Sequence, residues 1–237
     1  MTLSQKVTRM RFGFLVLLGA VLFASPQAKG QDFNYTLQVN TTNWSELSSQ
    51  TLCNSVNQPW QSSYRIATGF SFPFNGGSYD SVTIETNGYL VFDRNRDQAF
   101  AAFTTFYNVI DTSGNNSVLG YEVSGTAGNK ILKIQYLHVG LNNYSTEQLS
   151  YQLWLHENGQ IEVIVGENSF QSSNSASPFL LGVLDMNMMA ENRGYLVGYT
   201  SGNYIGQPVN NQTPEPLQIG TLPQSGTKFL FIPVGSN

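Results

Sequence analysis

The sequence predicts an all-β fold, a jelly-roll-like sandwich of two antiparallel sheets with about 11 or 12 strands. Three observations predict it. Short runs of alternating apolar and polar residues recur along the chain, separated by turns rich in glycine and asparagine. Charged residues make up only 11% of the chain, fewer than solvated helices would use. No long apolar repeat of helical period is present, which leaves only short segments over 44–49 and 98–103 as helical alternatives.

The densest strand pattern lies between residues 69 and 92. Three phenylalanines alternate with small residues over 70–74, and glycine-containing turns at 75–77 and 87–88 let the chain reverse twice. Strand, turn and strand in such quick succession indicate antiparallel pairing with one buried face. In the first half of the chain we therefore expect strands over 35–39, 64–67, 70–74, 82–86 and 89–92.

The second half continues in the same way. Apolar residues alternate strongly over 130–139 and 149–157, and Asn158-Gly159 is a hairpin turn. Prolines at 208, 214 and 216 argue against a central strand, so 210–217 is expected to be a long surface connection. The expected strands are 117–124, 130–139, 149–157, 161–165, 180–185, 194–199 and 228–232.

Residues 1–30 have the pattern of a secretion signal. Three basic residues lie within the first 11 positions, an apolar run covers 12–24, and Ala28 and Gly30 place small side chains where a signal peptidase cuts. The alternative, a membrane anchor, would need roughly 20 apolar residues. We therefore expect 31–237 to form a single exported domain without a transmembrane segment, secreted or at the cell surface, with the periplasm as a further location.

The charge of the exported part excludes some partners. Residues 1–30 hold four of the 11 basic residues and none of the 15 acidic ones, so the remaining formal charge is 7 − 15 = −8. Binding to nucleic acid or to an anionic membrane surface needs clustered lysine and arginine, which the chain lacks. We expect no nucleic-acid partner.

Four segments of the chain resemble a known family when they are taken in order. Residues 69–90 resemble the opening of a β-sandwich module common in secreted and surface proteins of Bacteroidota, and they are also similar to the nidogen-type extracellular module. The segments 124–136, 149–163 and 226–233 fit later parts of the same module. The resemblance implies export and a sandwich fold, and it brings no catalytic residues. The module usually has a tryptophan after its Asn-Gly turn, whereas 99–107 has none.

Cysteine and histidine give little support for catalysis. Cys53 is the single cysteine, so no internal disulfide can form; a partly buried apolar role is expected, with a catalytic thiol as the alternative. His138 and His156 are the only histidines, and both fall within expected strands. Neither has a neighbouring motif of a serine triad or a zinc site.

One loop offers oxygen ligands for a cation. Asp93, Asn95 and Asp97 occur at alternate positions, a spacing with which a loop can wrap calcium. The glycine and the distal glutamate of an EF-hand are missing, and Arg94 and Arg96 add positive charge. A solvated loop with internally paired charges is the alternative.

Three acidic residues flank the hairpin turn at Asn158-Gly159, namely Glu157, Glu162 and Glu167. Paired carboxylates could perform glycoside hydrolysis if the strands brought two of them to a catalytic separation. Ordinary exposed acids are the alternative, because no sequence pattern of a sandwich glycosidase surrounds them.

Aromatic residues are the more suggestive group. Three tryptophans and 12 tyrosines could stack on sugars or anchor a protein partner. Phe72, Phe74, Leu153 and Trp154 are expected in the core. The weak ligand-binding candidates lie near expected loops or strand ends and are Tyr107, Tyr144, Tyr195, Tyr199 and Tyr204.

The function that these observations favour is an exported, non-catalytic β-sandwich. It would bind a glycan or an extracellular protein, or serve as a surface or matrix component. A carbohydrate-active hydrolase using paired carboxylates and a self-assembling structural subunit are the alternatives.

Overall fold

The computed structural model describes residues 35–54, 63–93, 98–104, 110–111, 116–141, 144–169, 179–185, 194–209 and 219–235. All of them lie in one compact unit, residues 31–237. The predicted secretion signal over residues 1–30 falls outside the described part of the chain.

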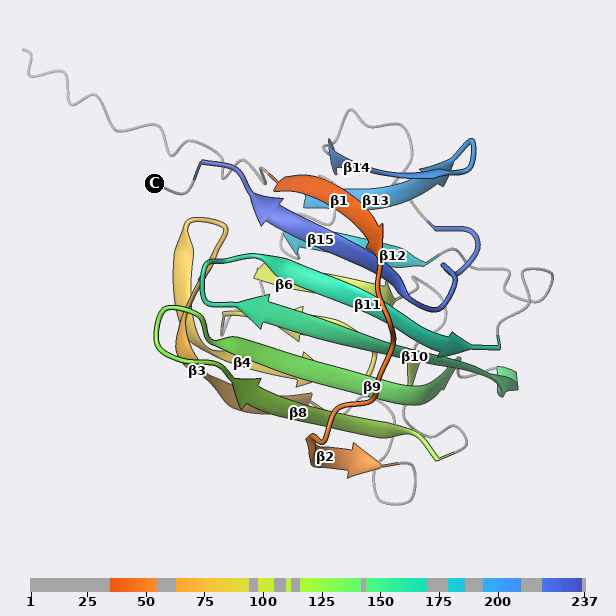
Figure 1. The fold of residues 1–237 in the computed structure, drawn as a ribbon, viewed down its shortest axis with the longest axis horizontal. Helices are drawn as coiled ribbons and strands as arrows, with labels where there is room; N and C mark the ends of the chain where they lie inside the picture. The colour runs from red at the N-terminus through yellow and green to blue at the C-terminus, as the bar shows by residue number, and fades with distance from the viewer. Residues whose placement is uncertain are drawn as a thin grey trace, which may run out of the picture. The chain divides into compact units, whose positions relative to one another are not determined.

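Two antiparallel sheets form the molecule, which confirms the predicted β-sandwich (Figure 1). Within the described residues there are 15 strands, more than expected, because the sequence pattern gave no sign of several short or edge strands. The eight-stranded sheet runs, in order, through β1 (Tyr35–Thr41), β15 (Thr227–Pro233), β11 (Ile161–Asn168), β10 (Tyr144–His156), β9 (Ile131–Leu141), β8 (Val118–Ser124) and β2 (Gln50–Asn54), and β7 (Ile110–Asp111) pairs with β9. The seven-stranded sheet runs through β14 (Asn203–Val209), β13 (Gly194–Thr200), β12 (Leu180–Asp185), β6 (Gln98–Thr104), β5 (Tyr89–Val91), β4 (Gly77–Glu85) and β3 (Ser63–Phe74).

The core lies between the two sheets and is rich in aromatic rings. The expected core residues Phe72, Phe74 and Leu153 are all buried. Phe74 and Phe92 stack with ring centroids 4.0 Å apart, both on the side of the seven-stranded sheet. Strand β3 buries alternate side chains over most of its length, as the period of two residues requires.

A pair of stacked tyrosines joins the two sheets. The rings of Tyr136 and Tyr151 are fully buried with centroids 4.6 Å apart, and burial raises the pKa of both hydroxyl groups well above its usual value. The Tyr136 hydroxyl donates a 2.7 Å hydrogen bond to the carbonyl oxygen of Glu85, the last residue of β4. A strand of one sheet is thereby bonded directly to the other.

Neither helical alternative forms. Residues 98–104 are strand β6, and all seven side chains are buried, because both faces of this central strand are covered. Residues 42–49 have no regular secondary structure. They leave β1 at one edge of the eight-stranded sheet and cross its outer face to β2 at the opposite edge (Figure 1). We call residues 42–49 the strap.

Two details of the edge strands differ from the expected pattern. The expected strands 64–67 and 70–74 are one strand, β3, because the four residues between Ala67 and Phe72 form an irregularity opposite a single residue of β4 and the pairing resumes after it. Pro208 lies inside β14 and not in a connection after it. This position is allowed because β14 is an edge strand, where a missing N–H costs no ladder hydrogen bond on the open side.

Candidate ligand-binding surface

The outer face of the eight-stranded sheet carries a row of side chains that run across four neighbouring strands. Glu122 of β8 lies opposite Lys133 of β9, Lys133 lies opposite Trp154 of β10, and Trp154 lies opposite Glu162 of β11. We call these four residues the outer-face row. Cross-strand neighbours are close enough for their side chains to interact, so the row is one continuous surface.

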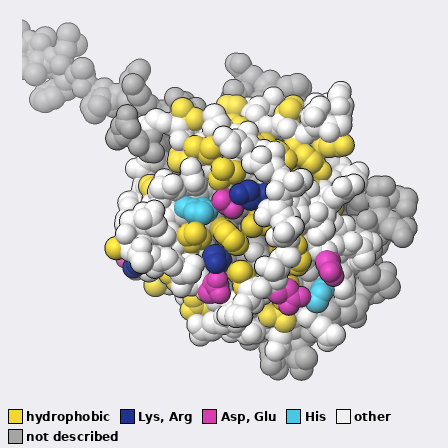
Figure 2. All heavy atoms as spheres, in the orientation of Figure 1, with side chains coloured by type: hydrophobic (Ala, Val, Ile, Leu, Met, Phe, Trp, Pro, Cys, Tyr) yellow, Lys and Arg dark blue, Asp and Glu magenta, His cyan; other side chains and the backbone are white. Residues whose placement is uncertain are grey.

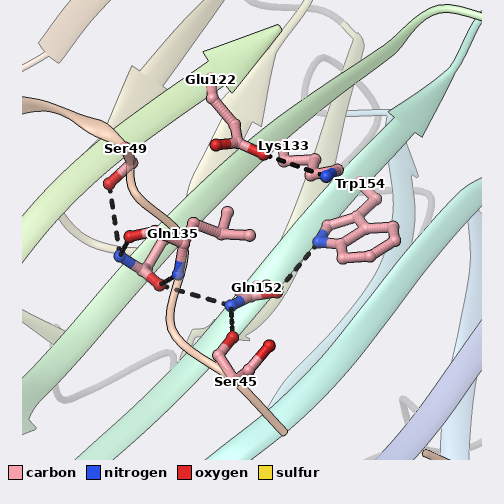
Figure 3. A network of polar contacts seen from close by, with 8 residues as sticks. Ser45, Ser49, Glu122, Lys133, Gln135, Gln152 and Trp154 are labelled. Atoms are coloured by element: carbon pink, nitrogen blue, oxygen red, sulfur yellow. Dashed lines mark hydrogen bonds and ion pairs between the residues drawn. The ribbon is translucent and has the colours of Figure 1, made fainter. Parts of the chain in front are cut away.

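Trp154 is at the centre of this row and is partly exposed. It was expected in the core, and that expectation is wrong. Leu153 and Leu155 occupy the inward positions of β10, so the residue between them must point outward. Lys133 Nζ lies 4.7 Å from the centre of the indole, in cation–π geometry. The indole N–H donates a 3.0 Å hydrogen bond to Gln152 Oε1, which fixes the ring orientation (Figure 3).

The charged groups beside Trp154 are paired. Lys133 Nζ lies 3.0 Å from Glu122 Oε1 on one side of the indole. On the other side, the Glu162 carboxylate lies 3.4 Å from His156 Nε2 and 3.5 Å from Lys228 Nζ. Figure 2 shows basic, acidic and histidine side chains gathered among hydrophobic ones on this face.

The pKa of Glu162 is lowered by these neighbours. The His156 side chain makes the largest contribution, partial burial opposes it, and the positive charge of Lys228 lowers the pKa further. Glu162 is therefore ionised at neutral pH. It is held as a carboxylate acceptor at the edge of the surface.

The strap forms one border of the surface. Gln135 and Gln152 face outward from β9 and β10, yet each is only 2% exposed because the strap covers them. Gln135 Oε1 accepts a 2.7 Å hydrogen bond from the backbone N–H of Leu47, and Gln152 Nε2 donates a 2.8 Å hydrogen bond to the Ser45 carbonyl (Figure 3). Gln152 also contacts Gln135 Oε1 at 3.3 Å, so the strap and the outer-face row share one network.

Trp44 anchors the same strap against β11. A Cβ atom at Gly166 would lie 2.5 Å from the Trp44 ring, so the indole packs directly on the glycine backbone. Only a residue without a side chain leaves room for this contact.

The two histidines take different places. His156 belongs to the surface described above. His138 lies at a β-bulge, where Leu137 and His138 together face Ser150 of β10, and its φ of 49° is unusual for a residue with a side chain. The His138 backbone N–H donates a 3.1 Å hydrogen bond to Ser150 Oγ.

The structure describes the side chains of three of the five predicted tyrosines, and their surroundings differ. Tyr107 lies outside the described residues, and Tyr144 begins β10, with its side chain outside the description. Tyr195 is only 4% exposed and packs 6.1 Å from the ring of Tyr35. Tyr199 and Tyr204 are cross-strand partners in the β13–β14 hairpin with rings 4.7 Å apart, and Tyr199 is 46% exposed.

The predicted calcium loop can be followed only at its first residue. Asp93 Oδ1 accepts a hydrogen bond from the Gln98 backbone N–H at 3.3 Å, whereas Asn95 and Asp97 lie outside the described residues. Among the residues that are described, no group of three His, Cys, Asp or Glu side chains is arranged to hold a metal ion. Calcium binding stays a prediction.

The hairpin acids have separate surroundings. Glu157 Oε2 accepts a 2.9 Å hydrogen bond from the Lys130 backbone N–H, which ties two neighbouring hairpins together. Glu167 is exposed. Glu162 is in contact with His156 and Lys228.

Sequence reasoning missed two of the four residues of the outer-face row, and it also missed Lys228 beside it. Glu122, Lys133 and Lys228 were not singled out, because isolated charged residues on strands carry no motif. The available signal was the alternation itself. It places Glu122 and Lys133 on the polar side of their strands, and the register then brings both beside Trp154.

Comparison with protein families gives a match over most of the chain. A protein-family model described as NIDO related matches residues 34–233. No curated protein and no solved structure matches the chain. In the described part of the chain, no helix is long and apolar enough to cross a bilayer.

Proposed function

Because the chain belongs to the NIDO-related family, we propose that it is an exported, non-catalytic β-sandwich that binds a glycan or an extracellular protein. A role as a surface or matrix component belongs to the same proposal. The proposal also includes cleavage of the secretion signal after residue 30. It further includes an origin among the related β-sandwich modules of Bacteroidota. The family's extracellular character is compatible with a location outside the cell.

The observation that carries the proposal is the position of Trp154. A large aromatic side chain is kept partly exposed on the outer face of a sheet whose inner face already provides a full core. Its orientation is fixed by Gln152 and Lys133. An oriented, partly exposed tryptophan among polar groups is the kind of residue that dominates binding surfaces.

The electrostatics of Glu162 favour binding over hydrolysis. A glycosidase needs one carboxylic acid whose pKa is raised, so that it can protonate the leaving group. The pKa of Glu162 is shifted in the opposite direction by His156 and Lys228. Glu157 is engaged with a backbone N–H and so has a structural task of its own.

A direct test uses residues 31–237 labelled with a fluorophore. The labelled protein is applied to an array of glycans and to a panel of extracellular proteins, and chromogenic glycosides are assayed in parallel. We expect saturable binding to at least one class of target and no turnover of any glycoside. Hydrolysis that is lost in Glu157→Gln or Glu162→Gln would replace the proposal with the hydrolase alternative.

The structural alternative is tested by light scattering on the same material. A binding module should remain at one small mass over a wide range of concentration. Growth into large, ordered assemblies without any target would instead establish a self-assembling subunit.

A further inference from the structure

We propose that the indole of Trp154 is a stacking platform for a neutral pyranose ring at the outer-face row. This inference rests on the proposed binding function and names the ligand class that the surface fits. Glu122 and Lys133 would bind sugar hydroxyl groups on one side of the ring, and Glu162 would do so on the other.

The shape of the platform suits a sugar ring. Figure 3 shows the Trp154 indole above its strand with Gln152 at its N–H edge, and the Lys133 ammonium lies over the ring, 4.7 Å from its centre. A pyranose is about as large as one indole and has a face made of C–H bonds, which packs against an aromatic surface. A deep pocket is not needed for such contact.

The charge pattern selects a neutral ligand. Lys133 is paired with Glu122, and Glu162 lies between His156 and Lys228. The two lysines and the two glutamates leave no net charge on the surface, so nothing there would neutralise a sulfate or uronate group. The formal charge of −8 on residues 31–237 would repel an anionic polysaccharide as well.

Hydrogen-bonding groups surround the platform at the right places. Carboxylate oxygens accept from hydroxyl groups, and the lysine ammonium has three N–H donors, of which the pair with Glu122 uses one. The side chains of Glu122 and Lys133 are 28% and 18% exposed, so both remain accessible while their partners hold them in place. These groups would fix the orientation of a ring that stacking alone leaves free to rotate.

The surface is held in shape before a ligand arrives. Gln152 is bonded at once to the indole N–H and to the strap, and the strap is bonded again through Gln135. A ligand would therefore bind without paying to order the tryptophan.

Affinity electrophoresis of the 31–237 chain in gels containing a neutral polysaccharide tests the inference. Barley β-glucan, xylan and galactomannan are the neutral probes, and alginate and heparin are the anionic ones. We expect retardation by at least one neutral probe and none by the anionic probes. Trp154→Ala should weaken the neutral interaction by about tenfold or more, and Trp154→Phe should keep part of it.

Ile205→Ala is the control, because Ile205 is an exposed hydrophobic residue on β14, in the other sheet. It should leave the interaction unchanged. Near-ultraviolet circular dichroism and the thermal midpoint show whether each variant is folded. If Trp154→Ala does not fold, Trp154→Phe still provides the test.

Three results would overturn the inference. They are neutral binding that survives in both Trp154 variants, stronger binding to alginate or heparin, and no binding to any neutral probe. In each case the wider proposal survives if the array or the protein panel still shows a target. Failure of the platform and failure of the binding function can thus be told apart.

Discussion

Gly88 shows how little room a single residue can have at the turn between β4 and β5. Its φ is +89°, and an added Cβ atom would lie 2.5 Å from the Ala102 carbonyl oxygen and 3.1 Å from the Tyr151 hydroxyl. Its carbonyl also accepts a 2.9 Å hydrogen bond from the Ala102 backbone N–H. The glycine of the Asn87-Gly88 turn is thus required both by its backbone conformation and by the closeness of β6.

Substitution of Gly88 by alanine separates these two requirements. Gly128 has a similar φ of +86° but no atom within 4 Å of an added Cβ, so Gly128→Ala measures the conformational cost alone. We expect Gly128→Ala to lower the free energy of unfolding by about 1 kcal/mol, and Gly88→Ala by about 2 kcal/mol or more. Urea denaturation of both variants measures the difference. Equal costs would show that the Ala102 contact is relieved by a small shift.

Ionisation of Glu162 makes the stability of the folded protein depend on pH in the acidic range. Its pKa is lowered in the folded protein by His156 and then by Lys228, so its contribution is complete above the ordinary value of 4.5 and is lost as pH falls through the lower folded-state value. Glu162→Gln should therefore reduce stability at pH 7 and flatten the loss of stability in acid. Glu167→Gln, at an exposed site, is the control, and thermal midpoints at a series of pH values provide the measurement.

The strap is an element without secondary structure that is held by side chains of the sheet beneath it. Gln135 supplies the acceptor for the Leu47 backbone N–H, and Gln152 supplies the donor for the Ser45 carbonyl. The backbone of the strap is not paired with a neighbouring strand. Hydrogen bonds from the two glutamine side chains therefore take the place of the backbone hydrogen bonds that a paired strand would make.

Gln135→Leu should release the centre of the strap. The Leu47 N–H would lose its acceptor, at a cost of about 1–3 kcal/mol if the group stays buried. Hydrogen exchange should then accelerate at residues 45–49 and remain unchanged in β9 and β10. The control is Gln38→Leu, because Gln38 is exposed on β1. Unchanged exchange at Leu47 would mean that the strap is held mainly by Trp44.

Elements with strong alternation could be predicted from the sequence, and those defined by distant partners could not. The patterns in β9 and β10 contain enough apolar residues on one side to reveal both strand and face. The same alternation assigned Trp154 to the outside, but its apolar character misleadingly favoured the core. The strap, the bulge in β3 and the edge position of Pro208 depend on which strands become neighbours, and local sequence does not contain that information.

At the scale of the whole molecule, a continuous core provides stability without covalent links. The described core cluster draws residues from strands of both sheets, and Cys53 is part of it at 5% exposure. A single cysteine cannot form an internal disulfide, so burial between the sheets must offset the chain entropy.

Cys53 should therefore report on opening of the sandwich. We expect its thiol to react with a disulfide reagent only when the protein unfolds, and the reaction rate to rise with urea in parallel with the unfolding transition. Reductant should leave the thermal midpoint unchanged. Rapid labelling of the native protein would show that the edge near β2 opens independently of the rest.

The order of strands has a consequence for how the molecule could be divided. The last strand, β15, lies between β1 and β11 and pairs with both of them. A chain ending before residue 227 would keep its other strands but leave an empty slot inside the eight-stranded sheet. A synthetic peptide of residues 227–233 could enter that slot from solution, which makes the sandwich a natural candidate for a two-piece reporter that becomes whole only when its fragments meet.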